Sequence, residues 1–274
     1  MIRITALNIY PVKGCRGIAL DSARIAATGF EHDREWLIVR PDGRFMTQRE
    51  EPRLALIETA VLESDSAAAQ LRLRVPGGAE LRAACSAEGK EIEVTCWKDR
   101  CAAFDAGDEA ADFLTRYLGA PYRLVRFDAR RKRPSGPEWT QGVEALNQFS
   151  DAFPWLLISE ASLEDLNGRL TRKLPMNRFR PNIVVSGLPP FGEDQLHDLT
   201  GGGVRLRPAK PCTRCIVTTT DQATGTRDGD EPLRTLAKFR FDRSLKGVTF
   251  GQNLILIDGI GAQLRVGQEL ESSG

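Results

Sequence analysis

The stretch EWLIVRPDGRFMTQR, residues 35–49, indicates the fold class of the chain. The apolar run Trp36 to Val39 is followed by a Pro-Asp-Gly turn, and a second apolar run begins at Phe45. Two short runs rich in strand-forming residues, joined by such a turn, are typical of a β-hairpin. We therefore predict two antiparallel strands on either side of residues 41–43.

Similar short runs lie on both sides of this hairpin. Apolar residues recur at near-alternate positions, or in brief clusters, in RITALNIYPVKG (3–14), LALIETAVL (54–62), QLRLRVPGG (70–78) and KEIEVTCW (90–97). Glycine and proline separate these runs. Short strands at this spacing favour a β-barrel or sandwich over repeated βαβ units.

One helix is expected to end this region, over residues 107–119. Asp108 is the candidate cap at its start, and Gly119 is placed to end it. The polar segment 128–142 then predicts a domain boundary or a long surface loop. Within it, the basic run 130–133 is interpreted as a solvated face.

The second half has a mixed pattern. Helices are expected over 159–170, with Ser159 as the cap, and over 228–240, with Pro232 near the start. Strands are expected over 180–187, 215–221, 252–259 and 262–270. The chain thus reads as mostly β (α+β), with peripheral helices.

Composition limits the possible partners and surroundings. The 274 residues are 41% hydrophobic and 27% charged, with a net charge of +1, so no nucleic acid polymer is expected as the main partner. No apolar run approaches a membrane span or resembles a secretory signal. We expect a soluble, cytoplasmic protein with no membrane partner, whose six cysteines are mostly thiols.

The pair Cys212 and Cys215, in RPAKPCTRCIVTTTDQATG (207–225), has three possible roles. A redox pair normally opens a helix, whereas the β-branched run after Cys215 favours a strand. A zinc site needs four ligands, and the nearest other pair is Cys96 and Cys101. Both cysteines could also be small buried residues. Lys210 and Arg214 lie beside them in sequence and favour a thiolate.

Several segments taken in order resemble one known family. They are IYPVKGCRGIAL, GFEHDREWLIV, FMTQREEPRLALI, LLISEASLEDLNGRL, NRFRPNIVVSG, CTRCIVTTTDQATGTRDGDEPLRTLAKFR and TFGQNLILI. Together they look like the MOSC proteins that carry an N-terminal β-barrel domain, among them the amidoxime-reducing components. The resemblance implies an N-terminal β-barrel-like domain over 1–125 and a MOSC β-barrel with peripheral helices over 126–274.

The resemblance also implies a molybdenum cofactor, Mo-molybdopterin, with Cys215 as the protein ligand of the metal and catalytic residue. Cys212 would not be a ligand. The other family positions that touch the cofactor match Lys13, Gly14, Arg34, Arg180, Asn182 and Thr213. Gly14 replaces a serine of the eukaryotic relatives, and Ala152 and Phe153 replace hydroxyl residues, so side-chain hydrogen bonds are lost at those positions. We expect the cofactor in a cleft between the two domains.

The function implied by the resemblance is that of a molybdenum-dependent oxidoreductase. It would reduce N-hydroxylated compounds, namely amidoximes, hydroxylamines and N-hydroxylated bases. No cysteine spacing typical of an iron–sulfur cluster follows the second domain, so electrons would come from a separate protein. The alternative is a non-catalytic cofactor carrier or sulfur-transfer module, because MOSC domains also occur in cofactor sulfurases.

Overall fold

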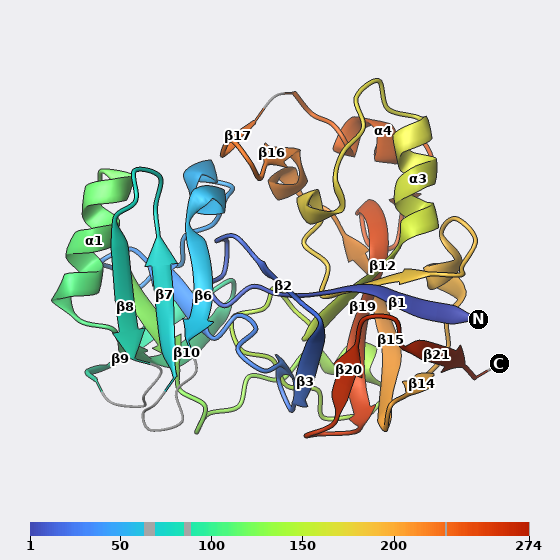
Figure 1. Ribbon diagram of the computed structural model, residues 1–274, viewed down its shortest axis with the longest axis horizontal. Helices are drawn as coiled ribbons and strands as arrows, with labels where there is room; N and C mark the ends of the chain where they lie inside the picture. The colour runs from blue at the N-terminus through green and yellow to red at the C-terminus, as the bar shows by residue number, and fades with distance from the viewer. Residues whose placement is uncertain (63–68, 85–88, 228, 274) are drawn as a thin grey trace.

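The computed structural model describes residues 1–62, 69–84, 89–227 and 229–273. Strands dominate, and the helices lie at the periphery, which confirms the predicted mostly β fold. In Figure 1 the strands β6 to β10 with α1 form one body, and the barrel strands with α3 and α4 form the other. Cys85 and Asp228 lie outside the described residues.

Seven strands close into a barrel in the second body. In order round the barrel they are β12 (Trp155–Ser159), β13 (Ile183–Ser186), β1 (Ile2–Ile9), β21 (Glu269–Ser272), β14 (Leu199–Gly201), β15 (Val204–Thr213) and β19 (Gly247–Asp258), which pairs again with β12. Only the β12–β13 pair among them is parallel. Alternate residues such as Ile4, Leu157 and Leu254 fill the interior, as a small barrel requires.

Two sheets make up the first body. One has the order β5 (Trp36–Val39), β11 (Arg123–Phe127), β10 (Asp99–Asp105) and β9 (Glu91–Cys96), and the other has the order β6 (Glu58–Leu62), β7 (Gln70–Arg74) and β8 (Glu80–Ala84). The helix α1 (Asp108–Leu118) packs Phe113 and Leu114 into their shared core. The predicted hairpin is present only in part: the chain turns back and Val39 bridges antiparallel to Phe45, but the second arm is not a strand, and β5 pairs with β11 instead.

The remaining elements are short. The strands are β2 (Ile18–Leu20), β3 (Ser22–Ala26), β4 (Gly29–Phe30), β16 (Thr220–Asp221), β17 (Thr226–Arg227), β18 (Phe241–Asp242) and β20 (Gln263–Arg265). The α-helices are α2 (Pro137–Thr140), α3 (Glu160–Gly168) and α4 (Leu233–Ala237). The 3₁₀ helices are η1 (Pro52–Leu56), η2 (Met176–Arg178), η3 (Gly192–Gln195) and η4 (Ile216–Thr219).

The two bodies do not divide the chain at a single point. The strand β1 comes from the start of the chain but pairs with β13 and β21 in the barrel of the second body. The expected boundary after residue 125 falls within β11. The division into 1–125 and 126–274 stays a prediction, and β1 ties the two parts together.

Four local predictions are wrong. The strand expected from Cys215 is the 3₁₀ helix η4, because Thr218 Oγ1 and Thr219 Oγ1 donate to carbonyls three residues earlier. Gly107, not Asp108, occupies the N-cap of α1. The helix expected over 228–240 is confined to α4, because the chain turns to pair Phe241 with Val248.

The fourth correction concerns one residue of the basic run 130–133, of which Arg130, Arg131 and Lys132 are exposed as predicted. Arg133 is buried, with 7% of its surface exposed, and is not part of a solvated face. Its Nη1 donates to Asn147 Oδ1 at 2.5 Å and to the carbonyls of Gln148 and Ser150, and its Nε donates to Asp99 at 2.9 Å. A guanidinium group has five N–H donors in one plane, so an arginine can bind this set of four acceptors with one side chain.

Candidate functional site

One cavity of about 140 Å³ collects every residue that the sequence predicts for the site. They reach it from distant parts of the chain, and they are Lys13, Gly14, Arg34, Arg180, Asn182, Thr213 and Cys215. Lys13 and Gly14 follow β1, Asn182 precedes β13, and Thr213 ends β15. The expected convergence of Lys13 and Arg34 with Arg180 and Cys215 is therefore present.

Cys215 lies where the barrel strand β15 gives way to η4. Thr213 is the last residue of β15 paired with β19, and the Arg214 amide donates to the Val248 carbonyl at 2.8 Å. The Cys215 carbonyl accepts from the amide of Thr218 at 3.0 Å. The backbone is thus fixed on both sides, while the half-buried thiol faces the cavity with no hydrogen-bond partner among the described residues.

The two cysteines of the pair have different surroundings. Both are free thiols. Cys212 Sγ accepts a hydrogen bond from Arg214 Nη1 at 2.9 Å, and its side chain packs against the apolar cluster around Phe179 and Phe250. Within the described residues, no three His, Cys, Asp or Glu side chains are grouped to hold a metal ion. A metal at Cys215 would therefore need further ligands from a bound group.

Two arginines of the site stack on one aromatic ring. The guanidinium carbons of Arg34 and Arg180 lie 4.6 and 4.2 Å from the centre of the Tyr10 ring. Both arginines have left-handed backbones, with φ of 53° and 57°. Non-glycine residues in this region carry strain and gather at functional sites. The Tyr10 hydroxyl donates to the Pro181 carbonyl at 3.1 Å, which fixes the ring beneath both cations.

Each of these arginines also has polar partners. Arg34 forms an ion pair with buried Asp33 and donates to Asn182 Oδ1 at 3.0 Å. Arg180 donates to the Cys15 carbonyl at 2.7 Å, and burial lowers its pKa from the usual arginine value. These contacts hold the guanidinium groups against the cavity, where an anion would replace the water they have lost.

Lys13 and Asp151 form a second polar cluster on the cavity wall. Lys13 is buried, donates to the Phe149 carbonyl at 2.8 Å and pairs with Asp151 Oδ1. The indole of Trp97 donates to the same oxygen at 3.2 Å. Desolvation raises the pKa of Asp151, but the charge and hydrogen bond of Lys13, together with the Arg34 charge and the Trp97 hydrogen bond, outweigh it. They hold that pKa well below its usual range.

Asn182 and Gly14 shape the site through the backbone. The side-chain oxygen Oδ1 of Asn182 accepts from Arg34 and from the backbone amide of Leu156. Its Nδ2 donates to the Asn8 carbonyl at 3.1 Å, so both polar atoms of the side chain are hydrogen-bonded. Gly14 has a φ of +85°, a conformation that favours glycine. A side chain at Gly14 would also meet Leu54 at 3.2 Å.

Sequence reasoning missed several residues of the site, among them Asp151, Trp97 and Gln48. Asp151 stands in the loop SDAFPW (150–155), next to Ala152 and Phe153, which the resemblance places at the cofactor, but its pairing with Lys13 depends on tertiary contact. Trp97 ends the run 90–97 that predicts a strand, and nothing in the local sequence indicates that its indole contacts Asp151. Gln48 donates to the Gly14 carbonyl at 2.6 Å and is fully buried, which no pattern indicated.

The cavity has an excess of positive charge. Of the described residues that line it, five are basic (Lys13, Arg34, Arg49, Arg180 and Arg214) and Asp151 alone is acidic. Asp33, behind Arg34, adds one further carboxylate. A partly exposed thiol beside this excess of cations suits a ligand that combines a soft metal with anionic groups.

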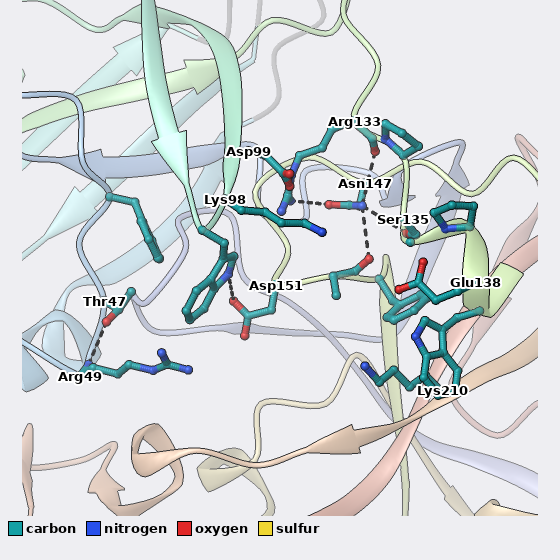
Figure 2. Close-up of a pocket in the computed structure, with 18 of the residues that line it drawn as sticks. Thr47, Arg49, Lys98, Asp99, Arg133, Ser135, Glu138, Asn147, Asp151 and Lys210 are labelled. Carbon is teal, nitrogen blue, oxygen red and sulfur yellow. Dashed lines mark hydrogen bonds and ion pairs between the residues drawn. The ribbon is translucent and has the colours of Figure 1, made fainter. Parts of the chain in front are cut away.

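A wider groove opens beside this cavity. It has a volume of about 820 Å³ and is lined from the β9–β10 hairpin, the segments 44–50 and 133–139, and Lys210. Figure 2 shows Arg49, Lys98 and Lys210 around this groove, and Asp151 lines both the groove and the cavity.

A closed barrel with the Cys215 thiol in a basic cavity, joined to a second β domain, defines the class of protein. Residues 1–121 match the MOSC N-terminal beta barrel domain, and residues 145–271 match the MOSC domain. None of the helices in the described part of the chain is long and apolar enough to cross a membrane.

Two relatives refine this assignment. Mitochondrial amidoxime reducing component 2 of Bos taurus is 36% identical over 264 residues, covering 89% of this chain and 74% of that protein. Mitochondrial amidoxime-reducing component 1 of Homo sapiens is 37% identical over 274 residues, covering 92% and 78%. The chain belongs to the family of two-domain MOSC proteins that includes these components, which confirms the resemblance seen in the sequence.

Proposed function

We propose that this protein is a molybdenum-cofactor-dependent reductase of N-hydroxylated compounds. The observation that carries the proposal is the thiol of Cys215, which has no hydrogen-bond partner among the described residues, in a cavity lined by five basic side chains and one acidic side chain. Relatives at 36% and 37% identity bear the name amidoxime-reducing component, which supports a reductase that acts on N–OH groups.

The residues of the cavity fit such a cofactor by charge and by ligand type. Cys215 would bind the metal through its thiolate, because a soft sulfur ligand suits a metal that is also held by dithiolene sulfurs. Lys13, Arg34 and Arg180 would bind the anionic part, and Gly14 and Thr213 would contact it at close range. Asn182 would act by holding Arg34 in place.

When bound, the cofactor would supply the two-electron chemistry that the side chains lack. Two electrons and two protons convert an N–OH group to N–H and release one water. We propose a separate protein as the electron donor and a cytoplasmic location. The protein's own part is to bind and orient the substrate and the cofactor in a partly enclosed site.

The test is molybdenum content per chain after expression in a host that makes the cofactor. We expect near-stoichiometric metal in the wild type and in Cys212→Ala, and loss of the metal in Cys215→Ala. Cys212→Ala is the matched control, because Cys212 is the neighbouring thiol with a different contact. A wild type without molybdenum, or a Cys215→Ala variant that retains it, would contradict the proposed ligand.

A second measurement separates the enzyme from a cofactor carrier. The metal-containing protein is given an aromatic amidoxime and a chemical reductant such as dithionite-reduced viologen. The proposal expects amidine formation that disappears in Cys215→Ala. Stoichiometric cofactor without turnover would favour the carrier or sulfur-transfer role.

A further inference from the structure

The groove beside the cavity is large enough for a second part of a ligand. At about 820 Å³ it lies within the range of small-molecule binding sites. Six residues line both the groove and the cavity: Thr47, Arg49, Trp97, Asp151, Ala152 and Phe153. A molecule in the groove therefore lies directly against the space that Cys215 faces.

Three basic side chains in the groove have no carboxylate partner among the described residues. They are Arg49, Lys98 and Lys210, whereas Arg44 pairs with Glu50 at 2.8 Å and Arg133 with Asp99 at 2.9 Å. Of the four acidic residues in the lining, only Glu138 lacks a basic partner in the described part of the chain. Net positive charge remains available to a ligand.

The three cations lie around one space. In Figure 2, Arg49 and Lys210 extend toward each other from opposite sides of the pocket, and Lys98 reaches in from the hairpin above them. Lys98 and Lys210 line the groove but not the inner cavity. Two of the three groove cations are thus distinct from the charge that surrounds Cys215, and Arg49 belongs to both spaces.

Indole rings accompany two of these cations. Arg49 lies 4.4 Å from the Trp97 ring centre, and Lys210 lies 4.6 Å from the Trp139 ring centre. Trp97 has a φ of +59° at the tip of the β9–β10 hairpin, a conformation that is costly for a bulky residue. Its hydrogen bond to Asp151 holds it at the border of groove and cavity.

We propose that the groove binds a phosphate-bearing planar heteroaromatic molecule of nucleotide size. The phosphate would bind Arg49, Lys98 and Lys210, and the ring would lie against the indoles. A concave site with aromatic walls favours such a small ligand over the surface of an acidic protein. The further statement that this ligand is the N-hydroxylated substrate rests on the proposed function.

The experiment is calorimetric titration of the full chain, expressed in a cofactor-producing host, with AMP and with adenosine as its uncharged counterpart. We expect AMP to bind at least tenfold more tightly. Lys98→Ala and Lys210→Ala should each weaken AMP about tenfold and leave adenosine unchanged. The control is Arg100→Ala, because Arg100 lies on β10 of the same hairpin, is exposed and pairs with Glu93 outside the groove.

Three outcomes would overturn the proposal. The first is AMP binding no tighter than adenosine, or unaffected by both lysine variants. The second is loss of molybdenum from these variants with AMP binding intact, which would assign the cations to the phosphate of the cofactor. The third is that the lysine variants bind AMP as the wild type does, and that their rate of reduction falls only when a protein, and not viologen, supplies the electrons. That result would assign the lysines to binding of the donor protein.

The result is independent of the proposed function. The AMP and adenosine comparison requires neither molybdenum nor turnover. A protein without metal that still prefers AMP would retain the groove assignment and remove the reductase assignment. An active reductase that does not bind AMP would retain the reductase assignment and remove the groove assignment.

Discussion

Gln48 and Gln222 exchange two amide hydrogen bonds across the join between the two domains. Gln48 Nε2 donates to Gln222 Oε1 at 3.1 Å, and Gln222 Nε2 donates to Gln48 Oε1 at 2.9 Å. Both side chains are buried. Gln48 also donates to the Gly14 carbonyl, so this pair links the first domain's loop to the cavity wall.

Replacing one member of this pair should destabilise the fold. Gln222→Leu removes both hydrogen bonds between Gln222 and Gln48 and leaves buried polar atoms unsatisfied. This should lower the free energy of unfolding by about 1–3 kcal/mol. Urea unfolding of the single variants and of Gln48→Leu/Gln222→Leu would measure the coupling between them. Thr224→Ala, at an exposed position on the same turn, should change the unfolding free energy by less than about 0.5 kcal/mol. Additive single effects would contradict the coupling.

The predictable parts of the fold are those with local causes. The turn around residues 41–43 needs only its local sequence, and it is present, whereas the run after it forms isolated bridges and no strand. The closure of the barrel depends on β1 pairing with β13 and β21, more than 170 residues away, and no local pattern specifies those partners. At Ile216, threonine hydroxyls bonded to backbone carbonyls overrode the strand propensity of the same residues.

The site shows the same division. The motif residues Lys13, Arg34, Arg180 and Cys215 could be named from the sequence, and they line one cavity. Tyr10, beneath both arginines, could not, because its role arises from two guanidinium groups that approach it from segments 24 and 170 residues away. Side chains that position others have no sequence pattern of their own.

Gly17 is expected to tolerate no side chain. A Cβ atom there would lie 2.5 Å from Tyr10 Cε1 and 2.7 Å from Cδ1, and the ring is fixed by its hydroxyl contact to Pro181. Gly17→Ala should therefore destabilise the fold by about 1–3 kcal/mol through overpacking. The measurement is the midpoint and slope of urea unfolding.

The matched control is a glycine with open space around it. A methyl group on Gly168, the last residue of α3, would meet no atom within 4 Å apart from its adjacent residues and its own helix backbone. Gly168→Ala should therefore be neutral or stabilise by up to about 1 kcal/mol. Equal unfolding free energies for Gly17→Ala and the wild type would show that the Tyr10 ring can move freely.

Asp151 should give the fold a distinct acid sensitivity. Lys13 holds the folded-state pKa of Asp151 below the unfolded value of about 3.9, so the ionised carboxylate stabilises the fold above that pH. This contribution is lost as the pH falls below about 4. Asp151→Asn should cost about 1 kcal/mol at pH 7, a small value because the carboxylate is 72% exposed and screened by solvent.

The check is the difference in unfolding free energy between the wild type and Asp151→Asn from pH 7 down to pH 2. The difference should shrink as the pH falls through this window. Asp112→Asn, on the exposed side of α1, is the control and should show little difference at either end. A difference that stays constant with pH would rule out the ion pair as its source.

Tyr10 should ionise only in strong alkali. Burial raises the pKa of its phenol to about 12, from an ordinary value near 10, although the neighbouring arginine charges oppose this. Because the folded state favours the protonated phenol, the stability from this group is present below pH 10 and is lost as the pH rises through 12. The ultraviolet absorbance of tyrosinate, wild type minus Tyr10→Phe, should therefore rise near pH 12, with circular dichroism recorded in parallel to confirm that the protein is folded. A difference spectrum that titrates near pH 10 in the folded protein would mean that water reaches the Tyr10 ring. Water would then also reach the faces of the ring on which Arg34 and Arg180 stack.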